Sequence, residues 1–216
     1  MSKMKKSETL VVFLGWGSIE KSYKKFFELA PANWEVVVVP YREFTREGSY
    51  QELNNALSRK LVRKKAILVG HSMGGALALK FAHTYPQNVK QLYLIDSEGI
   101  YGNENLLVIL WGFIISNSTF FRKNLNLLLI SLLEIFKSPL WHLKMARFAH
   151  NADLKEESRN IRIPTHIFWG EKDKVVPLWQ GQVLHQLIPQ SKLVVLNGMG
   201  HDWVLHSPEL FWERLK

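Results

Sequence analysis

Short apolar runs rich in valine, isoleucine and leucine alternate along the chain with longer segments in which apolar residues recur at helical spacing. Six runs are typical of strands: Leu10–Leu14, Glu35–Val39, Lys65–Val69, Leu92–Ile95, Thr165–Trp169 and Lys192–Leu196. The segments predicted as helices are Ser22–Leu29, Tyr50–Val62, Met73–Thr84, Leu178–Leu187 and Pro208–Lys216. Strands that are apolar throughout belong in a parallel sheet covered on both faces, so the pattern predicts a doubly wound α/β fold of about six strands.

The alternation of strands and helices stops between Gly99 and Asn160. This stretch contains three segments of helical character and no strand pattern: Leu106–Ile115, Leu125–Phe136 and Trp141–His150. We therefore predict a core formed by residues 1–98 and 161–216, with residues 99–160 inserted as a helical lid.

Composition places the chain among ordinary globular proteins and narrows its chemistry. Its 216 residues, 47% of them hydrophobic and 22% charged, suffice for one domain with a sizeable core. The absence of cysteine excludes disulfide scaffolds, thiolate metal sites and a cysteine nucleophile. It is also compatible with a reducing compartment, and we predict a cytoplasmic location.

Two segments superficially suggest a membrane or a secretion signal. The basic segment Met1–Lys6 precedes the apolar run Leu10–Leu14, but that run is too short for a signal peptide and Gly15 breaks it. The longest apolar run, Leu106–Ile115, has about half the length of a membrane span. We therefore expect neither a signal peptide nor a membrane span.

The net charge of +9 fits a nucleic acid, an acidic lipid or an acidic protein partner, or simply a need for solubility. Five positive charges lie within Arg59–Lys65, which precedes a strand and should therefore lie at the edge of the sheet opposite an active site. No nucleic-acid-binding motif accompanies them, so we predict no nucleic acid partner. Lys137, Lys144 and Arg147 fall in the predicted lid, where they would steer an acidic substrate or carrier protein.

A nucleophile motif stands where a strand gives way to a helix. The residues Gly-His-Ser-Met-Gly-Gly at 70–75 contain the pattern G-x-S-x-G between the predicted strand and the helix that begins at Met73. The sharp turn of such a motif exposes the hydroxyl of Ser72 at the carboxyl edge of the sheet. The amino end of the helix then points its N–H groups toward the reacting oxygen. Ser72 is therefore the predicted nucleophile.

Two further strands are followed by an acid and by a base. Asp173 lies just after the strand Thr165–Trp169, and His201 lies in the glycine-rich loop after the last strand. The order Ser, Asp, His is one in which catalytic triads occur, with His201 as general base and Asp173 as the acid that orients it. Asp96 competes for the role of the acid, because it directly follows the strand Leu92–Ile95.

The chain resembles the α/β-hydrolase superfamily over nearly its whole length, as a small lidded serine esterase of the carboxylesterase type. The resemblance rests on four motifs: Leu-Gly-Trp-Gly at 14–17, the serine motif at 70–75, Gly-Glu-Lys-Asp-Lys-Val-Val-Pro at 170–177, and Gly-Met-Gly-His-Asp at 198–202. Members usually begin with a two-stranded hairpin for which this chain lacks the residues. It resembles a trimmed core of six strands with a short lid.

An oxyanion hole needs two backbone N–H donors, one of which is normally the residue after the nucleophile. That residue is Met73. The second donor comes from the loop after the first strand, where the resemblance to the family's usual His-Gly pattern implies Trp16, with Leu14 in place of the histidine. A tight turn whose Trp16 ring only roofs the pocket is the alternative.

The predicted lid carries more apolar residues than a solvated helix needs, and three interpretations stay open. It packs on itself and on the edge of the sheet, it lines an acyl-chain tunnel through residues such as Trp111 and Leu128, or it dips into a membrane surface.

We predict hydrolysis of a carboxylic ester with an apolar acyl group through an acyl-enzyme intermediate, without cofactor or metal. The ester is a small molecule, either free, lipid or bound to a carrier protein. The alternatives are acyl transfer, C–C hydrolysis or hydroxynitrile cleavage by the same triad, and a silent binding module for a hydrophobic ligand.

Overall fold

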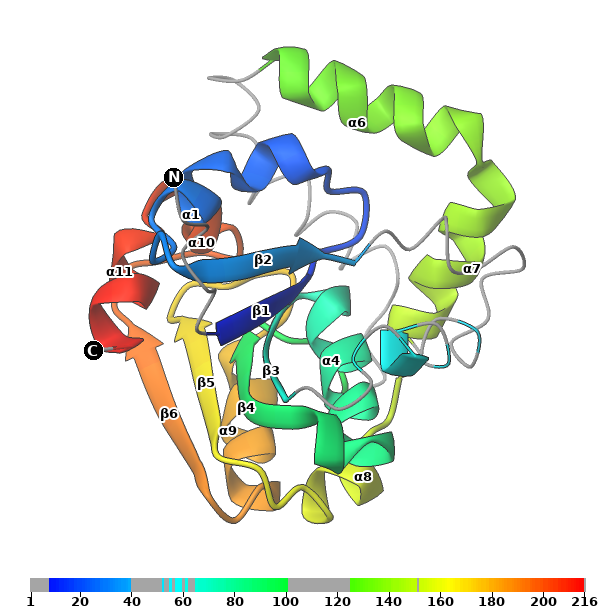
Figure 1. Ribbon diagram of the computed structural model, residues 1–216. Helices are drawn as coiled ribbons and strands as arrows, with labels where there is room; N and C mark the ends of the chain where they lie inside the picture. Colours follow the sequence, from blue (N-terminus) through cyan, green and yellow to red (C-terminus); the bar gives the residue numbers. More distant parts are fainter. Residues whose placement is uncertain are drawn as a thin grey trace.

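The computed structural model describes residues 8–39, 52, 55, 57–59, 61, 65–100, 125–150 and 152–215. These residues contain a six-stranded sheet in the order β2-β1-β3-β4-β5-β6, in which every neighbouring pair is parallel (Figure 1). The strands are β1 (Glu8–Phe13), β2 (Trp34–Val38), β3 (Ala66–His71), β4 (Val89–Ile95), β5 (Thr165–Gly170) and β6 (Ser191–Leu196). All of their carboxyl ends therefore meet at one edge.

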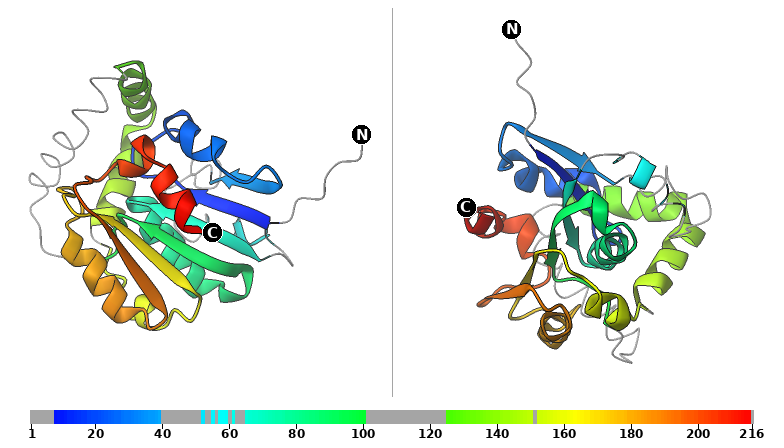
Figure 2. Two further views of the ribbon diagram at one scale, coloured as in Figure 1. Left: turned by 90° about the vertical axis from the view of Figure 1, so that its left-hand side faces the viewer. Right: turned by 60° about the horizontal axis from the view of Figure 1, so that its bottom comes forward.

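Helices cover both faces of this sheet (Figure 2). One face carries α4 (Met73–Thr84), α8 (Lys155–Arg159) and α9 (Leu178–Leu187). The other carries α1 (Lys24–Glu28), α10 (Trp203–His206) and α11 (Glu209–Trp212). Three short 3₁₀ helices complete this part of the chain: η1 (Glu20–Tyr23), η2 (Pro86–Asn88) and η3 (Glu213–Leu215).

The alternation of side chains along each strand divides the core into two layers. In β1, Val11 and Phe13 pack on the layer of α4 and α9, whereas Leu10 and Val12 pack on the layer of α1 and α11. Both sets are buried, which explains why the sequence shows an unbroken apolar run here instead of the alternation of a half-exposed strand.

Three helices are described within the predicted insertion at 99–160: α6 (Leu125–Lys137), α7 (Pro139–His150) and α8. The chain leaves and rejoins the core at one point, because the N–H of Leu154 donates to the carbonyl of Gly99 over 2.7 Å. The last of the three, α8, packs against α4 and α9 of the core. The division into residues 1–98 and 161–216 with a lid at 99–160 stays a prediction, and Trp111 lies outside the described residues.

The predicted fold class is confirmed, as is the parallel sheet of six strands. The helices predicted at 73–84 and 178–187 have those bounds, because each follows a strand and ends where its apolar spacing ends. The short helices α8 and α10 were not predicted, since about one turn carries no measurable periodicity. Most of the helix predicted at Tyr50–Val62 lies outside the described residues. Within the described residues, none of the helices has both the length and the apolar character needed to cross a membrane.

Candidate active site

Ser72 lies in a strained turn between β3 and α4. Its φ of 56° and ψ of −126° are unusual for a residue with a side chain, and the turn carries its hydroxyl to the carboxyl edge of the sheet. The N–H of Ser72 donates to the carbonyl of Ile95 over 3.0 Å, and its own carbonyl accepts from Gly75 and Glu98. The neighbouring strand β4 and the start of α4 therefore hold the turn in place.

The small residues of the motif allow α4 to approach β1 and β4 closely. A Cβ atom on Gly74 would lie 2.2 Å from the carbonyl oxygen of Phe13, and one on Gly75 would lie 2.1 Å from Oγ of Ser97. Neither contact is possible for a side-chain carbon. Glycine at both positions therefore sets how deeply the amino end of α4 sits behind Ser72.

Three side chains from three loops form one hydrogen-bonded chain at this edge. Nε2 of His201 lies 3.0 Å from Oγ of Ser72, and Nδ1 of His201 lies 2.7 Å from Oδ2 of Asp173. With Nδ1–H donating to the carboxylate, Nε2 is left to accept the proton of the hydroxyl. The structure thus brings together the predicted nucleophile, base and acid, all of which are buried.

Backbone amides fix the predicted acid. Oδ1 of Asp173 accepts from the N–H groups of Val175 and Val176 over 2.8 and 2.9 Å, which leaves Oδ2 for His201. The loop that follows β5 is therefore folded around this carboxylate. The Val-Val-Pro segment after Asp173 contributes its N–H groups to that arrangement.

Asp96, the competing acid, makes different contacts. It is fully buried with a positive φ of 42°, and its Oδ1 accepts from the N–H of Gly170 over 2.8 Å. Among the described residues, its Oδ2 has no hydrogen-bond partner. Burial, followed by the charge of Asp173, raises the pKa of the Asp96 carboxyl well above its usual value. Asp96 thus binds the end of β5 and lies close to the carboxylate bound to His201.

The loop after β1 lies beside the nucleophile. A Cβ atom on Gly15 would contact Cβ of Ser72 at 3.4 Å, which places the predicted oxyanion donor Trp16 next to this site. The second predicted donor, Met73, is the first residue of α4, and the N–H groups of a first turn have no acceptor within their helix. The indole N–H of Trp16 donates to the carbonyl of His142 over 2.9 Å, so α7 is tied to this loop.

A second hydrogen-bonded chain runs behind the first. The N–H of Gly15 donates to Oη of Tyr23 over 3.2 Å, and the Tyr23 hydroxyl donates to Nδ1 of His71 over 2.6 Å. Nε2–H of His71 then donates to the carbonyl of His201 over 3.1 Å. The loop of the predicted oxyanion donor is thereby connected to the loop of the predicted base.

The sequence analysis assigned no hydrogen-bonding role to His71 or to Tyr23. Burial, and then the charge of His201, lower the pKa of His71 to about 3, while burial raises the pKa of Tyr23. Both groups stay neutral near pH 7, as the directions of these hydrogen bonds require. The one available signal was the position of His71 inside the nucleophile motif.

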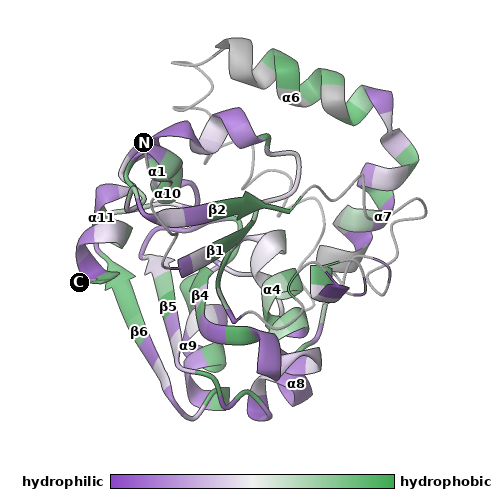
Figure 3. Cartoon of the chain, in the orientation of Figure 1, coloured by the Kyte–Doolittle hydropathy of each residue, from purple (hydrophilic) through white to green (hydrophobic). Residues whose placement is uncertain are grey.

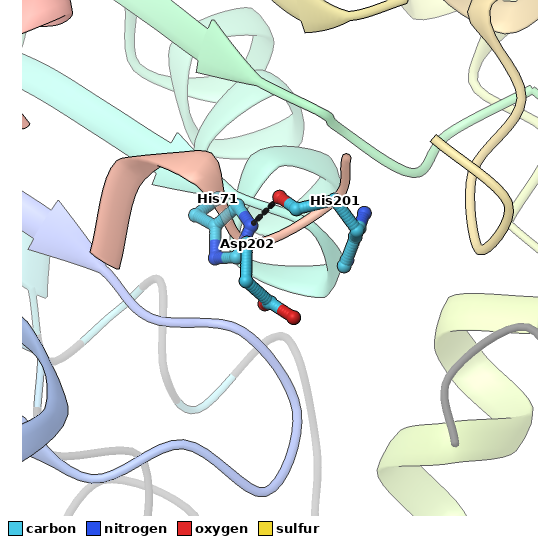
Figure 4. Close-up of side chains that lie close together, drawn as sticks. All are labelled: His71, His201 and Asp202. Carbon is cyan, nitrogen blue, oxygen red and sulfur yellow. Dashed lines mark hydrogen bonds between the residues drawn. The ribbon is translucent and has the colours of Figure 1, made fainter. Parts of the chain in front are cut away.

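His71, His201 and Asp202 form a cluster whose ligand-type atoms all lie within 4.8 Å of one another (Figure 4). All four ring nitrogens already take part in the hydrogen bonds given above, so a bound cation would have to displace them. We therefore assign no metal site here. Oδ2 of Asp202 is buried and has no hydrogen-bond partner in the part of the chain that the structure describes. Burial raises the pKa of that carboxyl to about 6.

The surrounding carboxylates strengthen His201 as a base. Burial alone would lower the pKa of His201, but the charge and hydrogen bond of Asp173 raise it, and the charges of Asp202 and Asp96 act in the same direction. Overall the pKa lies above its usual value. The protonated form of this imidazole is therefore more stable than that of an exposed histidine. Such stabilisation suits a group that accepts a proton from a hydroxyl.

Comparison with known sequences gives a family match over most of the chain. The sequence model of the Alpha/beta hydrolase family matches residues 11–214. Lipase 1 of Psychrobacter immobilis is 23% identical over 182 residues, which cover 74% of this chain and 57% of the lipase. The chain thus spans little more than half the length of that relative, and the same share holds for Lipase 3 of Moraxella sp..

Two further relatives cover more of both chains. A 2-hydroxy-6-oxononadienedioate/2-hydroxy-6-oxononatrienedioate hydrolase of Pseudomonas sp. is 25% identical over 225 residues, 87% of this chain and 76% of that protein. The crystal structure of a bromoperoxidase from Bacillus anthracis superposes with a TM-score of 0.78 at 19% identity, covering 98% of this chain and 91% of that one. A likeness at so low an identity shows the fold alone.

Proposed function

Because the chain belongs to the alpha/beta hydrolase family, we propose that it is a serine hydrolase that cleaves a carboxylic ester with an apolar acyl group. The observation that carries the proposal is the pair of hydrogen bonds of His201, 3.0 Å to Ser72 and 2.7 Å to Asp173. A nucleophile, a base and an acid within bonding distance have the geometry that acyl transfer to a serine requires.

In the first half of the proposed reaction, Oγ of Ser72 attacks the ester carbonyl while its proton passes to Nε2 of His201. The N–H groups of Met73 and Trp16 donate to the oxyanion of the tetrahedral intermediate. When the intermediate collapses, the bond to the alcohol oxygen breaks and that oxygen takes the proton from His201. The acyl group remains on Ser72 as an ester.

In the second half, water attacks the acyl-enzyme and gives its proton to His201. Collapse of this second intermediate breaks the bond to Ser72, whose Oγ recovers the proton, and the carboxylic acid leaves. Throughout, Asp173 holds Nδ1–H of His201 and stabilises the transient imidazolium. These steps need neither a metal nor an organic cofactor.

A fluorophosphonate probe together with a soluble p-nitrophenyl ester tests the proposal. Ser72→Ala should abolish labelling and lower kcat by several orders of magnitude, roughly 10⁴-fold or more, while the unfolding transition is retained. Ser191→Ala, which changes a serine at the start of β6 on the opposite edge, serves as the control and should label like the wild type. Hydrolysis of short esters by the Ser72→Ala protein at a near wild-type rate would refute the proposal, and so would a silent wild type, which would instead favour a binding module.

Hydrolysis of a C–C bond is the second candidate, and the Pseudomonas relative favours it, because the compounds in that protein's name contain no ester group. The same three residues would serve both reactions. Product analysis in water and with added alcohol separates ester hydrolysis, C–C cleavage and acyl transfer. We propose a small-molecule ester, free, lipid or carrier-bound, as the substrate and the cytoplasm as the location.

The lid enters this proposal as the part that selects the acyl chain. Leu128 lies on α6, and Trp111 lies outside the described residues, so a pocket formed by them stays a prediction. The bond from Trp16 to His142 and the burial of His142 and Met145 support a position of α7 over the active edge.

A further inference from the structure

Large hydrophobic side chains are exposed on one short stretch of the chain. Of the nine such side chains among the described residues, six lie between residues 129 and 143. These are Leu129, Leu132, Leu133, Phe136, Leu140 and Leu143, with Phe136 exposed to 77% and Leu140 to 75%. Single exposed apolar residues are ordinary, but six together on two consecutive helices form a patch that needs a partner.

The spacing of these residues places them on one face of each helix. In α6, residues 129, 132, 133 and 136 follow the i, i+3, i+4, i+7 pattern of a single stripe. In α7, Leu140 and Leu143 begin a stripe of the same spacing that continues with Lys144 and Arg147, all exposed. The opposite face of α7, with His142 and Met145, is buried against the core. We call the eight exposed residues the α6–α7 stripe.

The hydropathy of the chain shows the same asymmetry. In Figure 3 much of α6 is hydrophobic in colour, and the helix lies before α7 at the rim of the molecule (Figures 1 and 3). Its partly buried Ile135 lies near the loop after β1, with Cδ1 3.6 Å from the position of a Cβ atom on Gly17. A helix that packed on a core would bury such a face. The four stripe residues of α6 are instead exposed.

Charge decides between the occupants of such a face. Residues 125–150 contain three Lys or Arg residues, Lys137, Lys144 and Arg147, and a single acidic residue, Glu134, within a chain of net charge +9. A second copy of the chain would bring the same positive charge against the stripe. A bilayer with anionic headgroups complements it, because basic groups bind the headgroups while the apolar residues enter the acyl boundary.

We propose that the α6–α7 stripe is a docking surface that inserts its apolar residues into the interface of an anionic lipid membrane. The helices lie in the plane of that interface. Their apolar residues enter the boundary between headgroups and acyl chains to a depth of about 5–10 Å, while Lys144 and Arg147 lie among the headgroups. Since Trp16 binds the carbonyl of His142, docking through α7 brings the candidate active edge close to the lipid.

Vesicle flotation tests this surface without reference to the reaction. The Ser72→Ala protein, which should leave the lipid intact, is mixed with vesicles of phosphatidylcholine alone or with phosphatidylglycerol. The double variants Phe136→Ser/Leu140→Ser and Lys144→Glu/Arg147→Glu are prepared in the same background. Leu29→Ser, an exposed leucine on the sheet body, and Lys192→Glu, an exposed lysine on β6, are the matched controls.

We expect flotation with the anionic vesicles only, weakened about tenfold or more by each double variant and unchanged in the controls. With Ser72 restored, each double variant should hydrolyse a soluble acetate ester like the wild type, which shows that it is folded.

Three results would overturn the proposal: no flotation of the parent protein, equal flotation with neutral and anionic vesicles, and equal flotation of the parent and Phe136→Ser/Leu140→Ser. A dimer in solution that the same substitutions dissociate would assign the stripe to a second copy instead. None of these results bears on whether Ser72 is the nucleophile.

Discussion

Nε2 of His71 lies 3.1 Å from the carbonyl oxygen of His201, so the residue before the candidate nucleophile holds the backbone of the candidate base. The two rings also lie with their centroids 5.0 Å apart. Tyr23 donates to the other nitrogen of His71, so the Tyr23 hydroxyl and the carbonyl of His201 together orient this ring.

Replacing that hydroxyl tests the coupling. Tyr23→Phe leaves Nδ1 of His71 and the N–H of Gly15 buried without their partner, which should cost about 1–3 kcal/mol of unfolding free energy. We expect kcat for a soluble ester to fall about tenfold or more with KM little changed, because the loops of Trp16 and His201 lose their common support. Urea unfolding and steady-state kinetics give the two quantities.

Tyr85→Phe is the matched control, because its hydroxyl donates to Asn55 at the surface. It should leave kcat unchanged, and it should change the unfolding free energy by no more than about 0.5 kcal/mol. If Tyr23→Phe lost stability but kept full kcat, the second hydrogen-bonded chain would be structural only.

The two candidate acids can be separated by substitution. Asp173→Asn removes the charge that binds Nδ1 of His201, so we expect kcat to fall at least about a hundredfold with the melting temperature little changed. Asp96→Asn should do less to kcat, because Asp96 binds the N–H of Gly170 and not His201. Measuring kcat on one soluble ester alongside thermal melts decides the matter. The reverse order of effects would move the acid to Asp96.

The sequence predicts that Ser72, Asp173 and His201 lie together because each follows a strand that the pattern of apolar residues indicates. In a parallel sheet, residues after the strands must meet at one edge, so their proximity follows from topology. The helix at 73–84 could equally be predicted from the sequence, since a nucleophile motif leads into its first turn and a proline follows its end.

Other contacts of the site cannot be predicted from a local pattern in the sequence. Tyr23 and His71 are separated by 48 residues, and nothing in the spacing of either indicates that their side chains meet. Asp202 directly follows His201, yet its burial depends on the packing of α10 against α1. Such contacts follow from the three-dimensional fit of helices on the sheet and not from the period of any one segment.

The glycines of the nucleophile motif offer a test of packing that does not involve chemistry. A Cβ atom on Gly74 would lie 2.2 Å from a backbone oxygen of β1, so Gly74→Ala must push α4 off the sheet and should cost more than about 2 kcal/mol of unfolding free energy. Gly200→Ala is the control, since no atom lies within 4 Å of the added carbon and its φ is not positive. Equal unfolding midpoints for the two variants in urea would contradict the tight contact.

The buried carboxyl of Asp202 should affect the pH dependence of both the unfolding free energy and catalysis. The first effect is on the unfolding free energy. Its folded pKa of about 6 lies above the ordinary value of 3.8 because of burial, so the folded state favours the protonated form. That contribution is complete below about pH 4 and is lost as the pH rises through about 6. Asp202→Asn has no carboxyl to ionise and does not lose this stability. The unfolding free energy of the variant, relative to that of the wild type, should therefore increase between pH 4 and pH 7. Asp153→Asn, at the exposed surface beside Lys155, should show no such gain.

The second effect of Asp202 is on catalysis. The negative charge of Asp202 raises the pKa of His201, and His201 acts as a base only when it has lost its proton. Removing that charge lowers the pKa of His201, so the acid limb of kcat/KM in Asp202→Asn should move to lower pH, while kcat on the plateau stays close to that of the wild type. A pH–rate profile on one soluble ester, with Asp153→Asn beside it, measures the shift. An acid limb that stays in place or moves to higher pH would show that the charge of Asp202 does not act on the base.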